Sequence, residues 1–248
     1  SSSVCGSSGS TNLSRVSQVD ITPLCPSETS ECSGNGTYGI EQHVYEGIIN
    51  LPPGCGDDWV LSWSQCCRNS AINTLSSSSS QDMYVGAILD NTTAPVCNSS
   101  PVFNNAPGSI VCVDQPLVYN HGVSDADGDS LFFSFGTCYE GSGDAVNYSS
   151  GFNQTTPIST ASGLSINPNT GAISFTPNQT QVGVICVNVK EYRNGTMIGE
   201  INRDMQFTVI QCSNEPPQAT GVDGLPNVDP VNFVTDVCAN GELCFFVN

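Results

Sequence analysis

Short runs rich in Val, Ile, Phe, Tyr and Thr recur along this chain, and Gly, Pro, Asn, Asp and Ser separate them. This pattern is typical of β-strands joined by turns, whereas the periodicity of an amphipathic helix is almost absent. The sequence therefore predicts an all-β protein. We expect strands at residues 43–50, 59–64, 83–89, 109–113, 116–120, 130–135, 163–166, 172–175, 182–190 and 205–210.

The strand pattern divides the chain into three predicted domains. Residues 1–97 are expected to form a cysteine-rich β-sandwich, with Trp59, Leu61 and Trp63 on its core face. Residues 98–212 contain seven predicted strands, the number in an immunoglobulin-like sandwich. Residues 213–248 weakly repeat the start of the second domain, with prolines at 216–217 and a Val-Cys pair at 237–238. We expect tandem sandwiches, the third of them truncated.

Thirteen cysteines are the next constraint. None forms a CxxC pair or has a histidine nearby, so disulfides are favoured over a zinc site. Disulfides indicate an oxidising compartment, and the odd number leaves at least one thiol without an intrachain partner. Connectivity does not follow from spacing alone. Neighbouring strands and short loops favour Cys112–Cys212, Cys138–Cys186, Cys25–Cys32 and Cys238–Cys244. The adjacent Cys66 and Cys67 should point to opposite sides of an extended chain and find different partners.

The chain is strongly acidic, with 23 acidic and 5 basic residues and a formal net charge of −18. Binding to nucleic acid requires clustered Lys and Arg, so this class of partner is excluded, as are anionic membrane surfaces. No apolar run reaches the roughly 18 residues of a membrane-spanning helix, so direct membrane insertion is not expected. An acidic surface is common in secreted proteins, and it also suits divalent cations.

The acidic motif with the clearest chemistry is DADGD at residues 125–129. Its three aspartates repel one another unless a cation neutralises them, and Ca²⁺ takes six to eight oxygen ligands. In a seven-strand sandwich this loop lies at the same end as residues 191–195, which we expect to form a loop, and as the entry segment near residues 98–105, from which we expect a further oxygen ligand. The predicted ligands of a structural Ca²⁺ are therefore Asp125, Asp127, Asp129 and Glu191. The alternative is an Asp-rich turn held by side-chain-to-backbone hydrogen bonds.

Catalysis is not expected. The chain has two histidines, His43 and His121, and no GxSxG, HExxH or P-loop motif. Its closely spaced carboxylates lie in the predicted calcium loop. No catalytic residue and no organic cofactor site is predicted.

Several motifs resemble the repeats of bacterial surface proteins. Residues 163–177 (GLSINPNTGAISFTP) look like a hairpin of cadherin-like and immunoglobulin-like repeats, and DADGD resembles the calcium-associated loop of the same repeats. The segments LPPGC at 51–55, 59–64, CCRN at 66–69 and SPVF at 100–103 are similar to cysteine-bearing repeats of giant SprB-like adhesins of gliding Bacteroidota. The resemblance covers most of residues 38–210. It implies type IX secretion, an outer-membrane-attached location at the cell surface and a role in gliding.

The expected function is a structural or adhesive repeat of a large secreted adhesin or filament that attaches the cell to surfaces. Its expected partners are neighbouring repeats, and the abrupt ends of the chain favour a section of a longer protein. One alternative is a module that binds a glycan or protein through Tyr139, Tyr148 and Phe152. Another is an accessory domain of a secreted hydrolase.

Overall fold

The computed structural model describes residues 1–22, 29–34, 36, 39–52, 54–92, 98–107 and 109–212, and the backbone of 222–223 and 246–247. These residues form β-strands and two short 3-10 turns, η1 (Glu31–Ser33) and η2 (Ser78–Ser80), without any α-helix. The all-β prediction is therefore confirmed. Within this part of the chain, no helix has the length and apolar character needed to cross a membrane.

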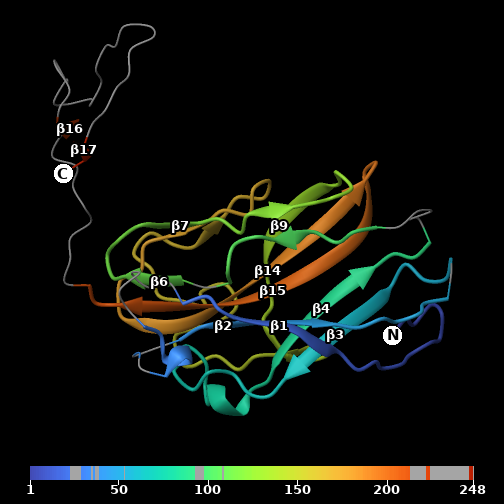
Figure 1. Ribbon diagram of the computed structural model, residues 1–248, viewed down its shortest axis with the longest axis horizontal. Coiled ribbons are helices and arrows are strands. Elements are labelled where there is room, and N and C mark those ends of the chain that lie inside the picture. The colour runs from blue at the N-terminus through green and yellow to red at the C-terminus, as the bar shows by residue number, and fades with distance from the viewer. Residues whose placement is uncertain are drawn as a thin grey trace, which may run out of the picture.

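One large, mostly antiparallel sheet organises the molecule (Figure 1). Its hydrogen-bonded order is β11-β10-β4-β15-β14-β9, with β3 added to β4 and β6 added in parallel to β15. Its strands are β3 (Trp59–Gln65), β4 (Met83–Leu89), β6 (Ser109–Cys112), β9 (Ser130–Gly136), β10 (Tyr139–Gly141), β11 (Asp144–Ala145), β14 (Gln181–Arg193) and β15 (Thr196–Ile210).

The β14–β15 hairpin forms the centre of this sheet. Its strands turn at Asn194 and Gly195, whose φ angles are +52° and +83°. A two-residue turn with positive φ at both positions matches the twist of the flanking strands, and Asn-Gly is its preferred sequence. Residues 191–193 are consequently strand, and the expectation that they form a loop was wrong.

A smaller sheet of β7 (Leu117–Tyr119), β12 (Ser165–Ile166) and β13 (Ile173–Phe175) covers one face of the central strands. The hairpin predicted at 163–177 is its β12–β13 pair. Side chains from both sheets meet in the main core, whose buried members are Phe133, Ile158, Ile173, Phe175, Ile185, Val187, Val189, Met205 and Phe207. The two layers make residues 98–212 a β-sandwich in the sense of two packed sheets.

The opposite face of β14 carries a second core cluster of Ile72, Leu75, Cys138, Val146, Val184 and Cys186. Because loops cover that face, β14 is buried on both sides at residues 183–187. A strand buried on both sides reads as a continuous apolar run, and the sequence of residues 182–189, VGVICVNV, follows this rule.

The large sheet continues across the boundary that the sequence analysis placed after residue 97. Residues Ala87 to Leu89 of β4 pair with Ile201 to Gly199 of β15, and β3 pairs with β4 over its whole length. Backbone hydrogen bonding therefore joins residues 59–89 to the following sandwich. Of residues 213–248, only the short pair β16 (Val222–Asp223) and β17 (Phe246–Val247) is described. The truncated third repeat lies otherwise outside the described residues.

Four disulfides form among the described residues: Cys5–Cys55, Cys66–Cys67, Cys112–Cys212 and Cys138–Cys186. The last two are the pairs that strand adjacency favours. The expectation for Cys66 and Cys67 was wrong, because the peptide bond between them is cis and they bridge each other. Cys32 is exposed and forms no disulfide with another described cysteine, while Cys25, Cys97, Cys238 and Cys244 lie outside the described residues, so the predicted pairs Cys25–Cys32 and Cys238–Cys244 remain predictions. Multiple disulfides indicate an oxidising, extracellular environment.

A buried ion pair ties the segment after β3 to the centre of the sheet. Arg68 donates two hydrogen bonds to the Asp204 carboxylate, at 3.1 and 2.7 Å, and both side chains are almost completely buried. The same guanidinium donates to the backbone carbonyls of Tyr139 and Asp82. One side chain thereby links β15, β10 and the residue that precedes β4.

Candidate metal centre

The loop of residues 125–129 leads into β9 and is organised by one aspartate. Asp125 Oδ1 accepts hydrogen bonds from the backbone N–H groups of Asp127 and Asp129, at 3.0 and 2.9 Å. Gly128 has a φ of +79°, a conformation that a side chain disfavours. The side-chain-to-backbone turn foreseen as the alternative to calcium is thus present, and it uses only one of the two oxygens of Asp125.

Glu191 approaches this loop from the neighbouring strand. It lies on β14 opposite Leu131 of β9 and Gly199 of β15, and it is only 2% exposed. A Cβ atom at position 199 would lie 3.0 Å from Glu191 Oε2. Glycine at 199 therefore leaves the space that the buried carboxylate occupies.

Asp125, Asp129 and Glu191 form a cluster in which one carboxylate oxygen from each residue lies within 4.8 Å of the others. Two buried oxygens, Asp125 Oδ2 and Glu191 Oε1, have no hydrogen-bond partner among the described residues. Buried polar atoms without a partner are rare in proteins. Burial, together with the neighbouring Asp129 and Asp125 carboxylates, raises the pKa of Glu191 to about 7. The site therefore lacks positive charge or hydrogen-bond donors at these two oxygens.

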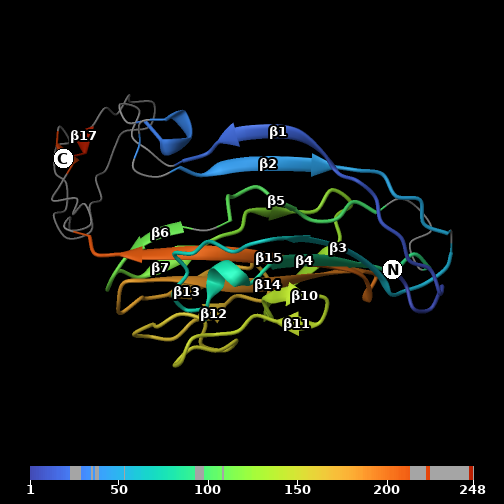
Figure 2. The same cartoon turned by 90° about the horizontal axis from the view of Figure 1, so that it is seen from below.

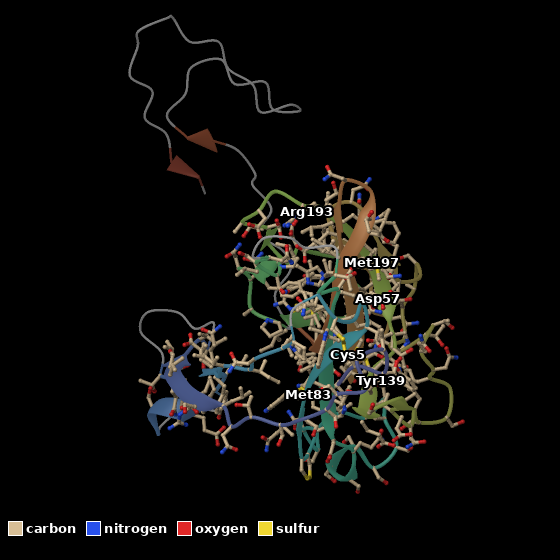
Figure 3. All side chains as sticks on the ribbon, turned by 90° about the vertical axis from the view of Figure 1, so that its right-hand side faces the viewer. Cys5, Asp57, Met83, Tyr139, Arg193 and Met197 are labelled. Carbon is tan, nitrogen blue, oxygen red and sulfur yellow. A yellow bond between two sulfur atoms is a disulfide. The ribbon has the colours of Figure 1, made fainter. Side chains whose placement is uncertain are left out.

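Arg193 supplies part of the missing charge at the tip of the β14–β15 hairpin (Figure 3). Its Nε donates to Asp129 Oδ1 at 2.8 Å, and its Nη2 donates to Asp129 Oδ2 and to Asn98 Oδ1. These contacts hold the pKa of Asp129 below its usual value. The single guanidinium satisfies Asp129 but reaches neither unpartnered oxygen.

Asp127 lies beside this cluster and outside it. Its Oδ2 accepts a hydrogen bond from the Ser99 backbone N–H at 2.6 Å and lies 3.7 Å from Arg193 Nη2. Of the four predicted ligands, the structure thus brings Asp125, Asp129 and Glu191 together and turns Asp127 towards the segment that precedes β5 (Val102–Phe103).

The donor set fits a hard cation. Carboxylate oxygens are the preferred ligands of Ca²⁺, which tolerates irregular coordination and completes it with water. One carboxylate oxygen each from Asp125, Asp129 and Glu191 would hold such an ion. Two further groups of potential ligands, at Cys66–Cys67 with Asp82 and at Cys138–Cys186 with Asp204, consist mainly of sulfurs already joined in disulfides.

No protein-family model matches this chain, and the comparison with curated proteins found no match.

The two histidines occupy opposite environments. His43 lies on the exposed strand β2 (Glu41–Glu46) beside Glu41 and Arg15. His121 is completely buried, stacked on Phe133, and its Nδ1 lies 3.1 Å from Arg203 Nη1. Burial and the Arg203 charge lower the pKa of His121 to about 4. Its neutral ring is therefore part of the core.

The role of Arg193 was not predicted, although its guanidinium binds Asp129 of the acidic loop. A signal for Arg193 was present. Asn194-Gly195 marks a two-residue hairpin turn, and that turn keeps residues 191–193 in the strand beside β9. The segment near residues 98–105 lies beside the acidic loop as expected: the Ser99 backbone N–H donates to Asp127 Oδ2, and Asn98 Oδ1 accepts a hydrogen bond from Arg193.

Replacement of Glu191 by glutamine is expected to stabilise the calcium-free protein. Above pH 7 the folded state must keep a desolvated carboxylate ionised, and the shift from 4.5 to about 7 corresponds to a penalty of up to about 3 kcal/mol. The penalty disappears as the pH falls through 4.5, where both states are protonated. Urea unfolding of Glu191→Gln with EDTA, above pH 7, measures the gain.

The matched control is Glu46→Gln, which removes the same charge from an exposed strand. It should change the free energy of unfolding by a few tenths of a kcal/mol at most. A loss of stability in Glu191→Gln above pH 7 would show that the ionised carboxylate is held by favourable contacts, contrary to its unpartnered oxygen.

Protonation of His121 is expected to destabilise the fold in acid. The folded pKa is about 4 and the unfolded value is 6.5, so the unfolded chain binds this proton first as the pH falls. The contribution of neutral His121 to the free energy of unfolding is complete above pH 6.5, and it decreases by about 3 kcal/mol as the pH approaches 4. Protonation of Glu191 in the same pH range changes the free energy of unfolding in the opposite direction. Unfolding is therefore measured from pH 6.5 to 5 in the Glu191→Gln variant, which lacks that carboxylate.

Adding His121→Gln to Glu191→Gln should flatten the pH dependence of the free energy of unfolding. Adding His43→Gln to Glu191→Gln should preserve that dependence, because His43 is exposed. Equal slopes in the two double variants would mean that His121 does not contribute to acid sensitivity.

Proposed function

We propose that this chain is a non-catalytic structural segment of a secreted cell-surface adhesin or filament, stiffened by a Ca²⁺ ion at Asp125, Asp129 and Glu191. The observation that carries the metal site is the pair of buried, unpartnered oxygens, Asp125 Oδ2 and Glu191 Oε1. The region holds four carboxylates, including Asp127, and one guanidinium, which pairs with Asp127 and Asp129 only. A divalent cation would offset the excess negative charge and complete the contacts of both oxygens.

The position of the site supports a mechanical role. Arg193 and Asp127 connect the acidic loop to Asn98 and Ser99, which belong to the segment entering the sandwich. Glu191 belongs to the central strand β14. A cation held between the loop and β14 would therefore brace the entry segment against the rigid sheet. Such bracing suits a stalk built from consecutive repeats.

The compartment and surface chemistry agree with this role. Four disulfides add stability to a small sandwich whose hydrophobic core is limited. The net charge of −18 suits a soluble, cation-rich extracellular setting. The resemblance to SprB-like repeats extends the proposal to attachment at the outer membrane, export by the type IX system and a part in gliding, with neighbouring repeats as partners.

The aromatic residues weighed for glycan or protein recognition give less support to a binding module. Tyr139, Tyr148 and Phe152 are each partly buried. Tyr148 packs on the second core cluster, and Tyr139 lies edge-on against Tyr84. These contacts stabilise the loops that cover β14 and leave little aromatic surface to stack on a sugar. A glycan-array signal that is lost in Tyr148→Ala would support the binding module instead.

Calorimetric titration of the oxidised protein with Ca²⁺ tests the metal site. We expect saturable binding that is abolished or strongly weakened in Asp125→Asn and Glu191→Gln. Binding only to the folded state stabilises it by about 2.7 kcal/mol at one hundred times Kd. For a domain of this size, that corresponds to a rise in Tm of about 5–10 °C.

Asp127→Asn is the matched control, since it removes one charge from the same loop without touching the three-carboxylate cluster. Its affinity should stay within about tenfold of the native chain, or about 1.4 kcal/mol. Equal melting temperatures in EDTA and in excess Ca²⁺ would refute the calcium site and leave the disulfides as the source of rigidity.

A further inference from the structure

The strands β1 (Ser14–Asp20) and β2 (Glu41–Glu46) form a two-stranded ribbon that no other described strand joins. Figure 2 shows it running alongside the sandwich as a separate layer, and Figure 3 shows it standing away from the body. Nearly every residue of both strands is exposed. An isolated two-stranded ribbon is marginally stable in water, so this one would gain from a further strand.

The ribbon exposes apolar side chains that a soluble arm would be expected to lack. Val16, Val19, Val44 and Tyr45 are 54, 51, 37 and 45% exposed. Proteins usually protect open strand edges with Pro, with Lys or by covering them. Neither strand contains Pro or Lys, and nothing in the described part of the chain covers their outer edges.

The two outer edges differ in charge. The β2 edge carries Glu41 and Glu46 near its two ends and no Lys or Arg, so an identical strand beside it would add like charges. The β1 edge carries Arg15 near one end and Asp20 at the other. Opposite charges at the two ends make β1 complementary to an antiparallel copy of itself.

The bulge in β1 makes this complementarity geometrically consistent. Arg15 pairs with Tyr45, Gln18 with His43 and Asp20 with Glu41, with one register shift between Arg15 and Ser17. Tyr45, His43 and Glu41 alternate along β2 and share a face. Their partners Arg15, Gln18 and Asp20 therefore share a face as well, with Gln18 midway between the two charges.

We propose that a second copy of this chain joins the β1 edge, giving a four-stranded antiparallel sheet with a two-fold axis at Gln18. In this register, Arg15 of each copy lies opposite Asp20 of the other, and Val19 of each lies opposite the Val16 bulge of the other. The contact is isologous, as in most homodimers. It uses no residue of the proposed calcium site and is independent of it.

Sedimentation velocity over a range of protein concentrations, at physiological ionic strength, tests the proposal. We expect a monomer–dimer equilibrium that Val19→Lys weakens at least tenfold, because a lysine on the edge opposes strand addition. Val118→Lys on β7 is the matched control, since Val118 is 71% exposed on the sandwich. It should leave dimerisation unchanged.

Charge exchange tests the register. Arg15→Glu places a glutamate opposite Asp20 of the second copy, and Asp20→Lys places a lysine opposite Arg15, so neither variant should dimerise alone. When the two variants are mixed, the introduced glutamate meets the introduced lysine, while the remaining Asp20 meets the remaining Arg15, and dimers should return. Hydrogen exchange of residues 14–20 should slow as the dimer forms.

A native chain that remains monomeric at all concentrations would overturn the proposal and leave the edge to a strand of another protein. A dimer that survives both Val19→Lys and Arg15→Glu would also overturn it, because the interface would then lie elsewhere.

Discussion

Replacing Arg68 by alanine is expected to destabilise the protein by about 3–5 kcal/mol, among the largest effects of any single substitution. The change leaves the Asp204 carboxylate buried without its partner, since the side chain is 4% exposed and both its oxygens bind Arg68. It also removes the donors to the carbonyls of Tyr139 and Asp82. Urea unfolding followed by tryptophan fluorescence measures the loss.

Two comparisons separate the unpaired charge from lost packing. Adding Asp204→Asn to Arg68→Ala should recover part of the stability, because a neutral amide is less costly to bury than a carboxylate. Lys190→Ala breaks the partly exposed pair with Glu200, at 3.9 Å, and should cost less than about 1 kcal/mol. A similar loss in Arg68→Ala and Lys190→Ala would contradict the importance of burial.

Removing the Cys138–Cys186 bridge as a double alanine variant is expected to cost about 4 kcal/mol. The bridge spans 48 residues of sequence, and closing such a loop in the unfolded chain accounts for about that much in the chain-entropy model. Both cysteines are buried in the second core cluster, so their loss also leaves space in the core. Thermal unfolding under non-reducing conditions measures the change in Tm.

The double variant Cys66→Ala with Cys67→Ala is the matched control. It also removes one disulfide, but the two cysteines are adjacent in sequence and exposed. The bridge closes no long loop, so its loss should cost much less. If the two double variants melted at the same temperature, neither loop length nor burial would explain the stabilisation by Cys138–Cys186.

Much of the strand content was predictable because strand formation here follows local pattern. The run at 83–89 coincides with β4, and 130–135 falls within β9. Both are rich in β-branched or aromatic residues and are bounded by turn-forming residues. The strand β1 was missed because its sequence, SRVSQVD, is mostly polar and was not distinguished from a loop.

The candidate site was predictable only to the extent that its residues lie in one motif. Asp125 and Asp129 belong to a recognisable acidic loop, and a sandwich topology suggested Glu191. The exclusion of Asp127 depends on the Ser99 backbone, and the role of Arg193 depends on an uninterrupted β14. Neither dependence is local in sequence, so spacing between acidic residues could not reveal it.

By itself the sequence determined the all-β class, because alternating apolar runs and turn residues act over a few neighbouring positions. It also indicated an oxidising environment, since so many cysteines without metal-site spacing favour disulfides. Only the tertiary structure decided that β3 and β4 join the following sandwich, and that two carboxylate oxygens remain buried without partners in the described part of the chain. These features arise from contacts between distant segments, where burial and packing outweigh local preference.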